Sequence, residues 1–354
     1  MNKKYGNKKL HLELLRIIAI IMVVLNHSDL FYTFYTNTYN KITFWFSLLV
    51  SSVCKINVPL FMVITGILLL PKNESIKTLL KKRVLKTIII LVVFSAVIYL
   101  LECFVWQIEV FDIFSFGKKL LRAEIQESYW YLYEYVGILL MLPFLGIMAR
   151  NLEKDIYQYF IIIGIILKLG VPVMNYFVNI HIPFTSFITI DSVFYILLGY
   201  YLENYITEDK LEKISYVKLS VSIVFCILFT AILVLFHYRK NGQWSQEPLS
   251  AVVPLLVILI FILSKKICNL IQHEKVTEII ELLGGSVFGV YLIERIGQRV
   301  FLAMYLGLCE HTYGIIACSI YVMCILIFGF GMVLAFRSVI RFRKKRIRVN
   351  DIGV

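Results

Sequence analysis

The sequence predicts an all-α integral membrane protein with about ten transmembrane helices, and three observations lead to this fold class. Of its 354 residues, 60% are hydrophobic and the mean hydropathy is +0.81, values far too apolar for a soluble chain of this length. The apolar residues form runs close to the roughly 20 residues that a helix needs to cross a bilayer. The basic residues gather in alternate connections between these runs, as they do in polytopic membrane proteins.

The apolar runs predict ten spans, an even number that places both termini on one side of the membrane. With cytoplasmic termini, the inside segments carry 26 of the 36 lysine and arginine residues and the outside loops carry six. The positive-inside rule then predicts a multi-pass protein of the cell membrane with both termini in the cytoplasm. The net charge of +13 follows from this topology and requires no nucleic-acid partner. The expected spans are residues 13–35, 43–70, 84–106, 129–149, 156–176, 186–204, 216–237, 249–265, 281–307 and 313–337.

We expect one integral-membrane domain over residues 1–354, because the sequence shows no internal repeat, no low-complexity linker and no separate soluble domain. The first apolar stretch lacks a small-residue cleavage pattern, so we expect it to remain as the first span. The seven cysteines lie mostly in apolar runs, without a CxxC pair or a histidine-rich spacing. We therefore expect buried thiols, with neither a disulfide framework nor a metal site.

The first span carries the strongest candidate for chemistry, an arginine and a histidine inside an apolar helix. Arg16 and His27 are eleven residues apart, which in an α-helix returns them to within about 20° of one face, about 16 Å apart. Titratable groups in an apolar span cost roughly a few kcal/mol each, so they usually face a protein interior or a wet cavity. His27 can act as a general base, and Arg16 can hold a phosphate group. A structural histidine and a topological arginine are the alternatives.

The second span should be interrupted by Pro59 and Gly66, a feature tolerated where neighbouring helices or a cavity satisfy the backbone. It leads into a basic loop that contains Lys82, Arg83 and Lys86. These residues suit the phosphates of a soluble cytoplasmic donor. Positive-inside topology with contacts to anionic membrane lipid explains them equally well.

Other polar residues in the spans mark a candidate pocket for an acceptor substrate. Trp130 and Glu134 lie in the fourth span, Asp191 lies in the sixth, and Tyr291 and Glu294 lie in the ninth. Most ionisable residues within the spans fall in the outer half of the membrane, which favours a wet pocket open to the extracytoplasmic side. An interfacial aromatic belt and structural ion pairs are the alternatives. The two glutamates are also the candidates to orient the ring of the first-span histidine.

Short motifs in these stretches resemble the acyltransferase-3 family of bacterial integral-membrane acyltransferases. The first span has the leucine-arginine opening and terminal histidine of that family, and the second has its proline, phenylalanine and glycine pattern. The basic loop and the glycine-serine to tyrosine segment of the ninth span match as well, and the end of the sixth span is similar. The matching segments read LLRIIAIIMVVLNH, VPLFMVITGILL, KKRVLK, GGSVFGVYLIE and FYILLGYYL.

The resemblance implies a membrane-embedded O-acyltransferase that uses acyl-CoA, most simply acetyl-CoA. It implies that His27 and Arg16 are required and that the acceptor is a hydroxyl group of a cell-surface glycan or its lipid-linked precursor. Many family members have histidines near the positions of Ser128 and Glu294, where this chain has serine and glutamate. A second function class stays open, because charges paired across transmembrane helices also describe a transporter of a small polar solute or an acylated intermediate.

Overall fold

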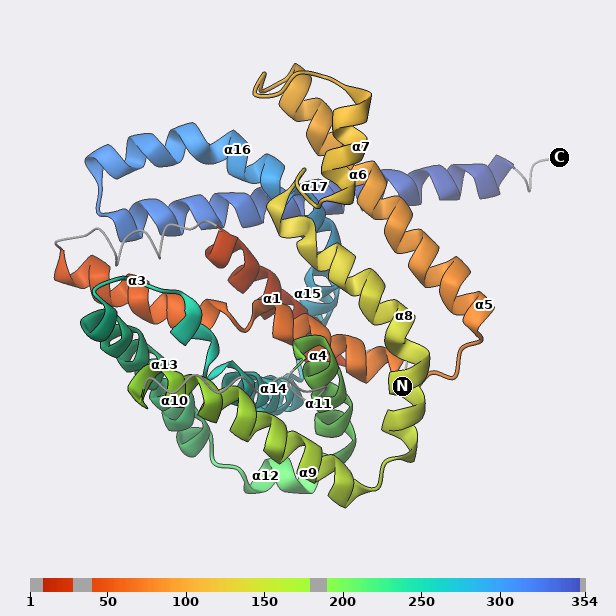
Figure 1. The fold of residues 1–354 in the computed structure, drawn as a ribbon. Helices are drawn as coiled ribbons and strands as arrows, with labels where there is room; N and C mark the ends of the chain where they lie inside the picture. The colour runs from red at the N-terminus through yellow and green to blue at the C-terminus, as the bar shows by residue number, and fades with distance from the viewer. Residues whose placement is uncertain (1–8, 28–39, 179–189, 351–354) are drawn as a thin grey trace. The chain divides into compact units, whose positions relative to one another are not determined.

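Helices make up nearly all of the chain that the computed structural model describes, which is residues 9–27, 40–178 and 190–350, with the backbone alone at 175–178 and 341–350 (Figure 1). These ranges contain no strand, and the predicted all-α class is confirmed. The chain divides into two compact units, one of Met1–Ser47 with Ile267–Val354 and one of Leu48–Lys266. The expectation of a single membrane domain stays a prediction.

The first unit is built around α1 (Leu10–His27). This helix packs on α15 (Glu274–Gly284) and also contacts α16 (Val287–His311) and α17 (Gly314–Asn350). The last two helices form a hairpin that reverses at residues 312–313. Apolar residues at helical spacing give α1 its buried face, because one stripe of a helix must be covered by its neighbours. The buried apolar residues of α1 are Leu12, Leu15, Ala19, Ile20, Val23 and Val24.

The second unit contains the crossing of α4 (Asn57–Leu69) with α11 (Asp191–Tyr205). Gly66 of α4 faces the backbone of Ile196, and Gly199 of α11 faces the backbone of Val63. Small residues let two helix backbones approach this closely, because a Cβ at either glycine would come within 3.0 Å of a Cα in the other helix. The unit also contains α5 (Ile76–Leu79), α6 (Leu85–Phe104), α7 (Ile113–Leu121), α8 (Trp130–Asn151), α9 (Lys154–Ile165), α10 (Val171–Val178), α12 (Glu208–Lys213) and α13 (Tyr216–Asn241). The unit boundaries fall within α3 (Lys41–Cys54) and α14 (Val253–Leu270).

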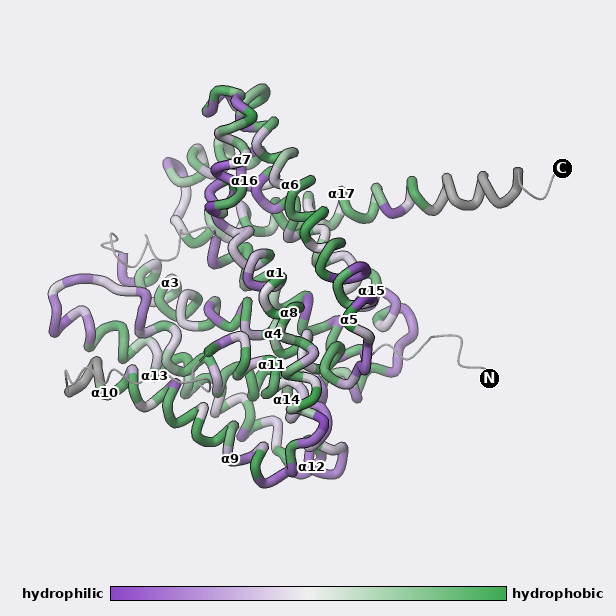
Figure 2. Tube along the Cα trace, turned by 45° about the vertical axis from the view of Figure 1, so that its right-hand side comes forward, coloured by the Kyte–Doolittle hydropathy of each residue, from purple (hydrophilic) through white to green (hydrophobic). Residues whose placement is uncertain are grey.

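Eight helices of the described ranges are long and apolar enough to cross a membrane, or nine if the bent pair α15 and α16 is one span. Hydrophobic residues dominate these helices, and hydrophilic ones mark α12 and the connections (Figure 2). The nine correspond to nine of the ten expected spans, so the multi-pass architecture is confirmed. The tenth, expected at 186–204, begins outside the described residues, and its described part is the 15-residue α11. A helix of that length is about 22 Å long, shorter than the bilayer core, and its central residues are covered by protein.

The second span breaks next to one of the two residues expected to interrupt it. The helix is interrupted at Lys55 and Ile56, between α3 and α4. Pro59 lies in the first turn of α4, and a proline ring clashes with the helical carbonyl four residues before it, which here belongs to Lys55. Gly66 continues α4 and serves the crossing with α11. The prediction of a broken span is therefore right for Pro59, and its assignment to Gly66 is wrong.

Candidate active site

His27 ends α1, and its ring lies against Glu294 of α16. The ring nitrogen Nδ1 is 3.1 Å from each carboxylate oxygen of Glu294. The carboxylate is fully buried, whereas the histidine side chain is 22% exposed. A carboxylate only accepts hydrogen bonds, so Nδ1 is the donor, and the lone pair of the neutral ring resides on Nε2. The arrangement leaves the histidine as the member of the pair that a substrate can approach.

The carboxylate of Glu294 is itself fixed by neighbouring side chains. Gln298, one turn further along α16, donates from Nε2 to Oε1 of Glu294 at 2.9 Å. The hydroxyl group of Tyr321 on α17 donates to the backbone carbonyl of Gln298 at 2.9 Å. Sequence reasoning missed Gln298, although its spacing of four residues from Glu294 was a signal that could have found it. The result is a chain of contacts that fixes the carboxylate before any substrate binds.

Arg16 lies nearer the start of α1 and forms an ion pair with Glu13. Its Nη1 atom is 2.5 Å from Oε1 of Glu13, whose side chain is buried. Guanidinium carries five N–H donors, so this contact leaves donors for a further anion. The buried glutamate packs on Gly284, where an added Cβ would lie 2.6 Å from the Cβ of Glu13. Sequence reasoning gave Glu13 no role.

A second arginine contacts the break that directly follows Gly284, at Gly285 and Ser286. The chain bends by 59° between α15 and α16. At this bend, Nη1 of Arg337 on α17 donates to the hydroxyl oxygen of Ser286 at 2.7 Å. That hydroxyl donates in turn to the carbonyl of Leu282 at 2.8 Å. In the sequence Arg337 is one of the basic residues of the inside segments, and its contact with Ser286 could not be inferred there.

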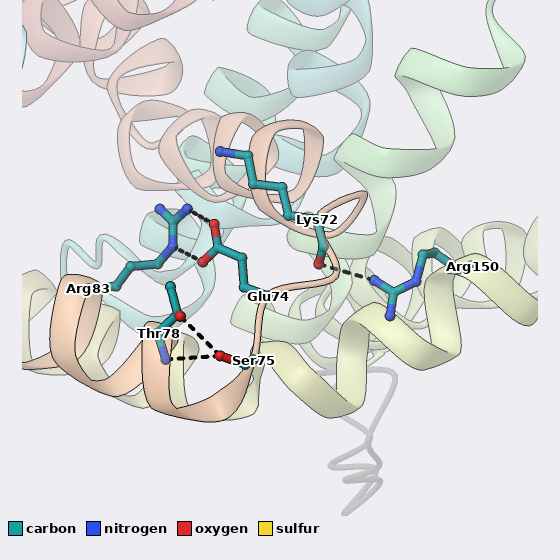
Figure 3. A network of polar contacts seen from close by, with 6 residues as sticks. All are labelled: Lys72, Glu74, Ser75, Thr78, Arg83 and Arg150. Carbon is teal, nitrogen blue, oxygen red and sulfur yellow. Dashed lines mark hydrogen bonds and ion pairs between the residues drawn. The ribbon is translucent and has the colours of Figure 1, made fainter.

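The basic loop of the second unit enters α6 through a turn of π-helix, Leu80–Val84. Arg83 within this turn binds both oxygens of Glu74, through Nε at 2.6 Å and through Nη2 (Figure 3). This ion pair lowers the pKa of the Glu74 carboxyl below its ordinary value. Lys82 and Lys86 are exposed. The predicted basic cluster therefore consists of two exposed lysines and an arginine that already has a carboxylate partner.

Two further contacts order the same loop. Arg150 of α8 donates from Nη1 to the carbonyl of Leu70 at 2.7 Å. The same atom reaches the carbonyl of Lys72 at 3.4 Å (Figure 3). Ser75 caps α5, because its hydroxyl oxygen accepts from the backbone N–H of Thr78 at 3.3 Å. The loop thus has a defined conformation in which its lysines are held at the surface.

Residues 10–336 of the 354 match the family model described as the acyltransferase domain of type 3. The chain belongs to the acyltransferase-3 family. The resemblance predicted from the short motifs is thereby confirmed, and the protein is a multi-pass membrane acyltransferase. Neither the curated proteins nor the solved structures contain a significant match to the chain. His27, Glu294 and Arg16 fall within the matched residues, and Arg337 is the first residue beyond them.

The predicted acceptor residues of this acyltransferase-3 protein are divided between the two units. Tyr291 shares the first unit with the histidine and lies one turn before Glu294 on α16, where it is buried. Both carboxylate oxygens of Glu294 contact His27, so its geometry favours orientation of the ring over binding of an acceptor. Of the two glutamates proposed to orient the histidine, the structure brings this one to the ring.

The other three predicted acceptor residues belong to the second unit. Trp130 is exposed at the start of α8, and Glu134 follows one turn later with intermediate exposure. Asp191 is exposed at the start of α11 and pairs with Lys168, which lies in a second π-helical turn, Ile166–Gly170. These residues and the histidine belong to different units, so their role stays a prediction. Among the described residues no group of histidine, cysteine and acidic side chains is arranged to hold a metal ion.

Proposed function

We propose that this membrane acyltransferase moves an acyl group, most simply acetyl, from acyl-CoA to a hydroxyl group of a cell-surface glycan or its lipid-linked precursor. The contact of His27 with the buried carboxylate of Glu294, at 3.1 Å, carries the proposal. A histidine held in this way has one nitrogen fixed as a donor and the other prepared to accept a proton. That is the group which an acyl transfer to a hydroxyl requires.

In the proposed reaction, Nε2 of His27 removes the proton of the acceptor hydroxyl as its oxygen attacks the thioester carbonyl. The carbon–sulfur bond then breaks, and the sulfur leaves with the proton from Nε2, which restores the neutral ring. Glu294 stabilises the imidazolium that exists between these two transfers. The products are the O-acylated acceptor and free coenzyme A, so no further reactant is needed.

Arg16 is proposed to hold a phosphate of coenzyme A at the start of α1. It is about 16 Å from His27 along the helix, and the pantetheine arm would extend over this distance. The N–H donors that Glu13 does not use can bind phosphate oxygens. Lys82, Arg83 and Lys86 are proposed as further contacts for donor phosphates, with the arginine using the donors left by its glutamate partner. Two exposed lysines in an ordered loop support this assignment.

The acceptor is proposed to enter from the extracytoplasmic side, with both chain termini in the cytoplasm. Trp130, Glu134, Asp191 and Tyr291 are the proposed acceptor contacts. Exposed Asp191 and Trp130 support this, because a carboxylate accepts hydrogen bonds from hydroxyl groups and an indole offers an apolar face with one N–H donor.

The test measures the transfer of radiolabelled acetyl from acetyl-CoA to envelope material in membranes that contain the chain. His27→Ala removes the proposed base and should lower the rate roughly 10²- to 10⁴-fold. Glu294→Gln removes a hydrogen bond to a charged group, worth roughly 1.5–3 kcal/mol. At about 1.4 kcal/mol per tenfold change, the rate should fall roughly 10- to 150-fold.

The matched control is Glu310→Gln, which changes an exposed glutamate near the end of the same helix and should leave transfer unchanged. Because Glu294 is proposed to act through His27, the double variant should be no slower than His27→Ala alone. Normal transfer by His27→Ala at wild-type protein levels would refute the general base. Additive losses in the double variant would make Glu294 a structural residue instead.

A further inference from the structure

The connection between α6 and α8, residues 105–126, exposes apolar side chains where a loop in water would expose polar ones. Val110 and Leu121 are 86% exposed, and Phe114 is 85% exposed. The last two belong to α7, none of whose residues is buried. Exposed apolar residues that gather in one segment indicate an interaction surface, whereas scattered ones do not. We call this connection the α6–α8 hairpin.

The α6–α8 hairpin folds back along α6 instead of extending away from it (Figure 1). The chain reverses at Gln107, whose φ is +54°, and the N–H of Ile108 then donates to the carbonyl of Glu102 at 3.0 Å. Tyr99 fixes the chain segment that runs back toward α6. Its hydroxyl group accepts from the N–H of Asp112 at 3.1 Å and donates to the carbonyl of Val110 at 3.2 Å. Tyr99 lies five residues, about 7 Å, before the end of α6. The start of α7 is therefore at the depth of the last turns of a membrane span.

The other end of the hairpin is fixed in the same way by α8. The hydroxyl group of Tyr133 in the first turn of that span donates to the carbonyl of Leu120, in the last turn of α7. The chain then turns at Ala123, whose φ is +58°. Both ends of α7 are thus attached to side chains that lie inside the ends of spanning helices. The hairpin is therefore held beside the ends of two spanning helices and does not project beyond them.

The apolar surface of the hairpin continues the lipid-facing side of α6. The rings of Phe104, at the end of α6, and Phe111 have centroids 5.6 Å apart, and both residues are exposed. Val97 and Leu100 of α6 are exposed within a span that is long enough to cross the membrane. An exposed apolar residue within a span contacts lipid, because water is absent from the bilayer core. The same lipid therefore reaches the hairpin without a change of environment.

We infer that the α6–α8 hairpin is a membrane-embedded element that binds the lipid bilayer at the boundary of acyl chains and headgroups. Phe114 and Leu121 enter the acyl chains. Lys118 and Arg122, which are exposed on the same helix and at its end, reach the headgroups. Lys118 lies only about 40° around the helix from Phe114, and its long stem can carry the ammonium group from the apolar side to the headgroups. On the topology proposed above, the lipid belongs to the outer leaflet.

The test uses the full chain reconstituted in vesicles of phosphatidylethanolamine and phosphatidylglycerol, with or without bromine on the acyl chains. Phe114→Trp adds an indole to the four native tryptophans, and the emission it adds is measured against the wild type. Brominated lipid should quench this added emission, and aqueous iodide should leave it nearly unchanged. Glu124→Trp is the matched control, because the side chain of Glu124 is 52% exposed in the same hairpin but polar. Its added emission should be quenched by iodide.

Two results would overturn the inference. Equal quenching of both variants by iodide would make the hairpin an aqueous loop. Protection of the Phe114→Trp emission from both quenchers would mean that protein covers the surface, either a partner or a second copy of the chain. Leu121→Trp repeats the measurement at the other end of α7, so failure of one variant to fold leaves the inference testable.

Discussion

Replacing Gly66 by alanine tests the crossing of α4 and α11. An added methyl group would lie 1.9 Å from the carbonyl oxygen of Ile196, 2.7 Å from its carbonyl carbon and 3.0 Å from its Cα. Non-bonded heavy atoms pack at about 3.5–4.0 Å, so the two helices would have to separate by more than about 1 Å. All three contacts are backbone atoms, which cannot rotate away as a side chain can. Overpacking of this kind typically costs about 1–3 kcal/mol of folding free energy.

The assay is the apparent melting temperature of the purified protein, read from the monodisperse fraction that survives heating. Gly137→Ala is the matched control, because this glycine lies inside α8 and an added Cβ meets nothing within 4 Å. We expect the control to melt at or slightly above the wild type, and Gly66→Ala to melt clearly below it. Gly199→Ala should resemble Gly66→Ala, and the double variant should lose less than the sum, since one separation accommodates both methyl groups. Equal melting of Gly66→Ala and Gly137→Ala would refute the close crossing.

Three further predictions concern the donor, the basic loop and the topology. Arg16→Ala should raise the concentration of acetyl-CoA needed for half-maximal transfer more than it changes the maximal rate. An unchanged acetyl-CoA requirement would mean that this arginine serves only the topology of the chain. The pKa of Glu74 is lowered by its ion pair, so the pair stabilises the fold above the unfolded carboxyl pKa of about 4.3 and the contribution is lost as the pH falls through the lower folded pKa. Glu74→Gln should therefore cost up to roughly 1 kcal/mol at neutral pH and nothing in acid, as thermal melts at several pH values would show. Reporter fusions at residues 115 and 242 should be extracytoplasmic and a fusion at the C-terminus cytoplasmic; an external C-terminus would mean that the span count is wrong by one.

The membrane fold was predictable because a bilayer imposes two constraints that are written locally in the sequence, the length of apolar runs and the placement of basic residues. The details of the fold that depend on packing between helices could not be predicted, because the residues that pack together lie far apart in the sequence. Pro59 marked the break at Lys55 and Ile56, whereas the role of Gly66 depends on α11, which lies about 130 residues further along the chain. The burial of α11 at its crossing with α4 could not be recognised, because burial by protein and contact with lipid select the same apolar residues.

The sequence predicted which residues belong to the candidate site better than it predicted which of their side chains contact one another. Helical periodicity placed Arg16 and His27 on one face, since both lie on one helix. The contact between His27 and Glu294 joins residues 267 positions apart, and no periodicity reaches that far. Glu294 and Glu134 were therefore equal candidates, and only the packing of α1 with α16 distinguished them. Similarly, the sequence showed the bases of the cytoplasmic loop but gave no sign that Glu74 binds one of them.

The π-helical turn at Leu80–Val84 changes the direction in which the side chains of α6 point around the helix axis. The N–H of Leu85 bonds to the carbonyl of Leu80, five residues back, where an α-helix would bond to the fourth. One residue is in effect absorbed in the wide turn, so side chains beyond it are displaced around the axis by about one position relative to an uninterrupted helix. Lys82 and Lys86, four apart in sequence, point in nearly the same direction, because each residue of the wide turn rotates the chain less than a residue of an α-helix does. A ligand can therefore contact both from one side of the helix, and a helical wheel drawn through this turn at 3.6 residues per turn would misplace the lipid-facing residues of α6 by about one position.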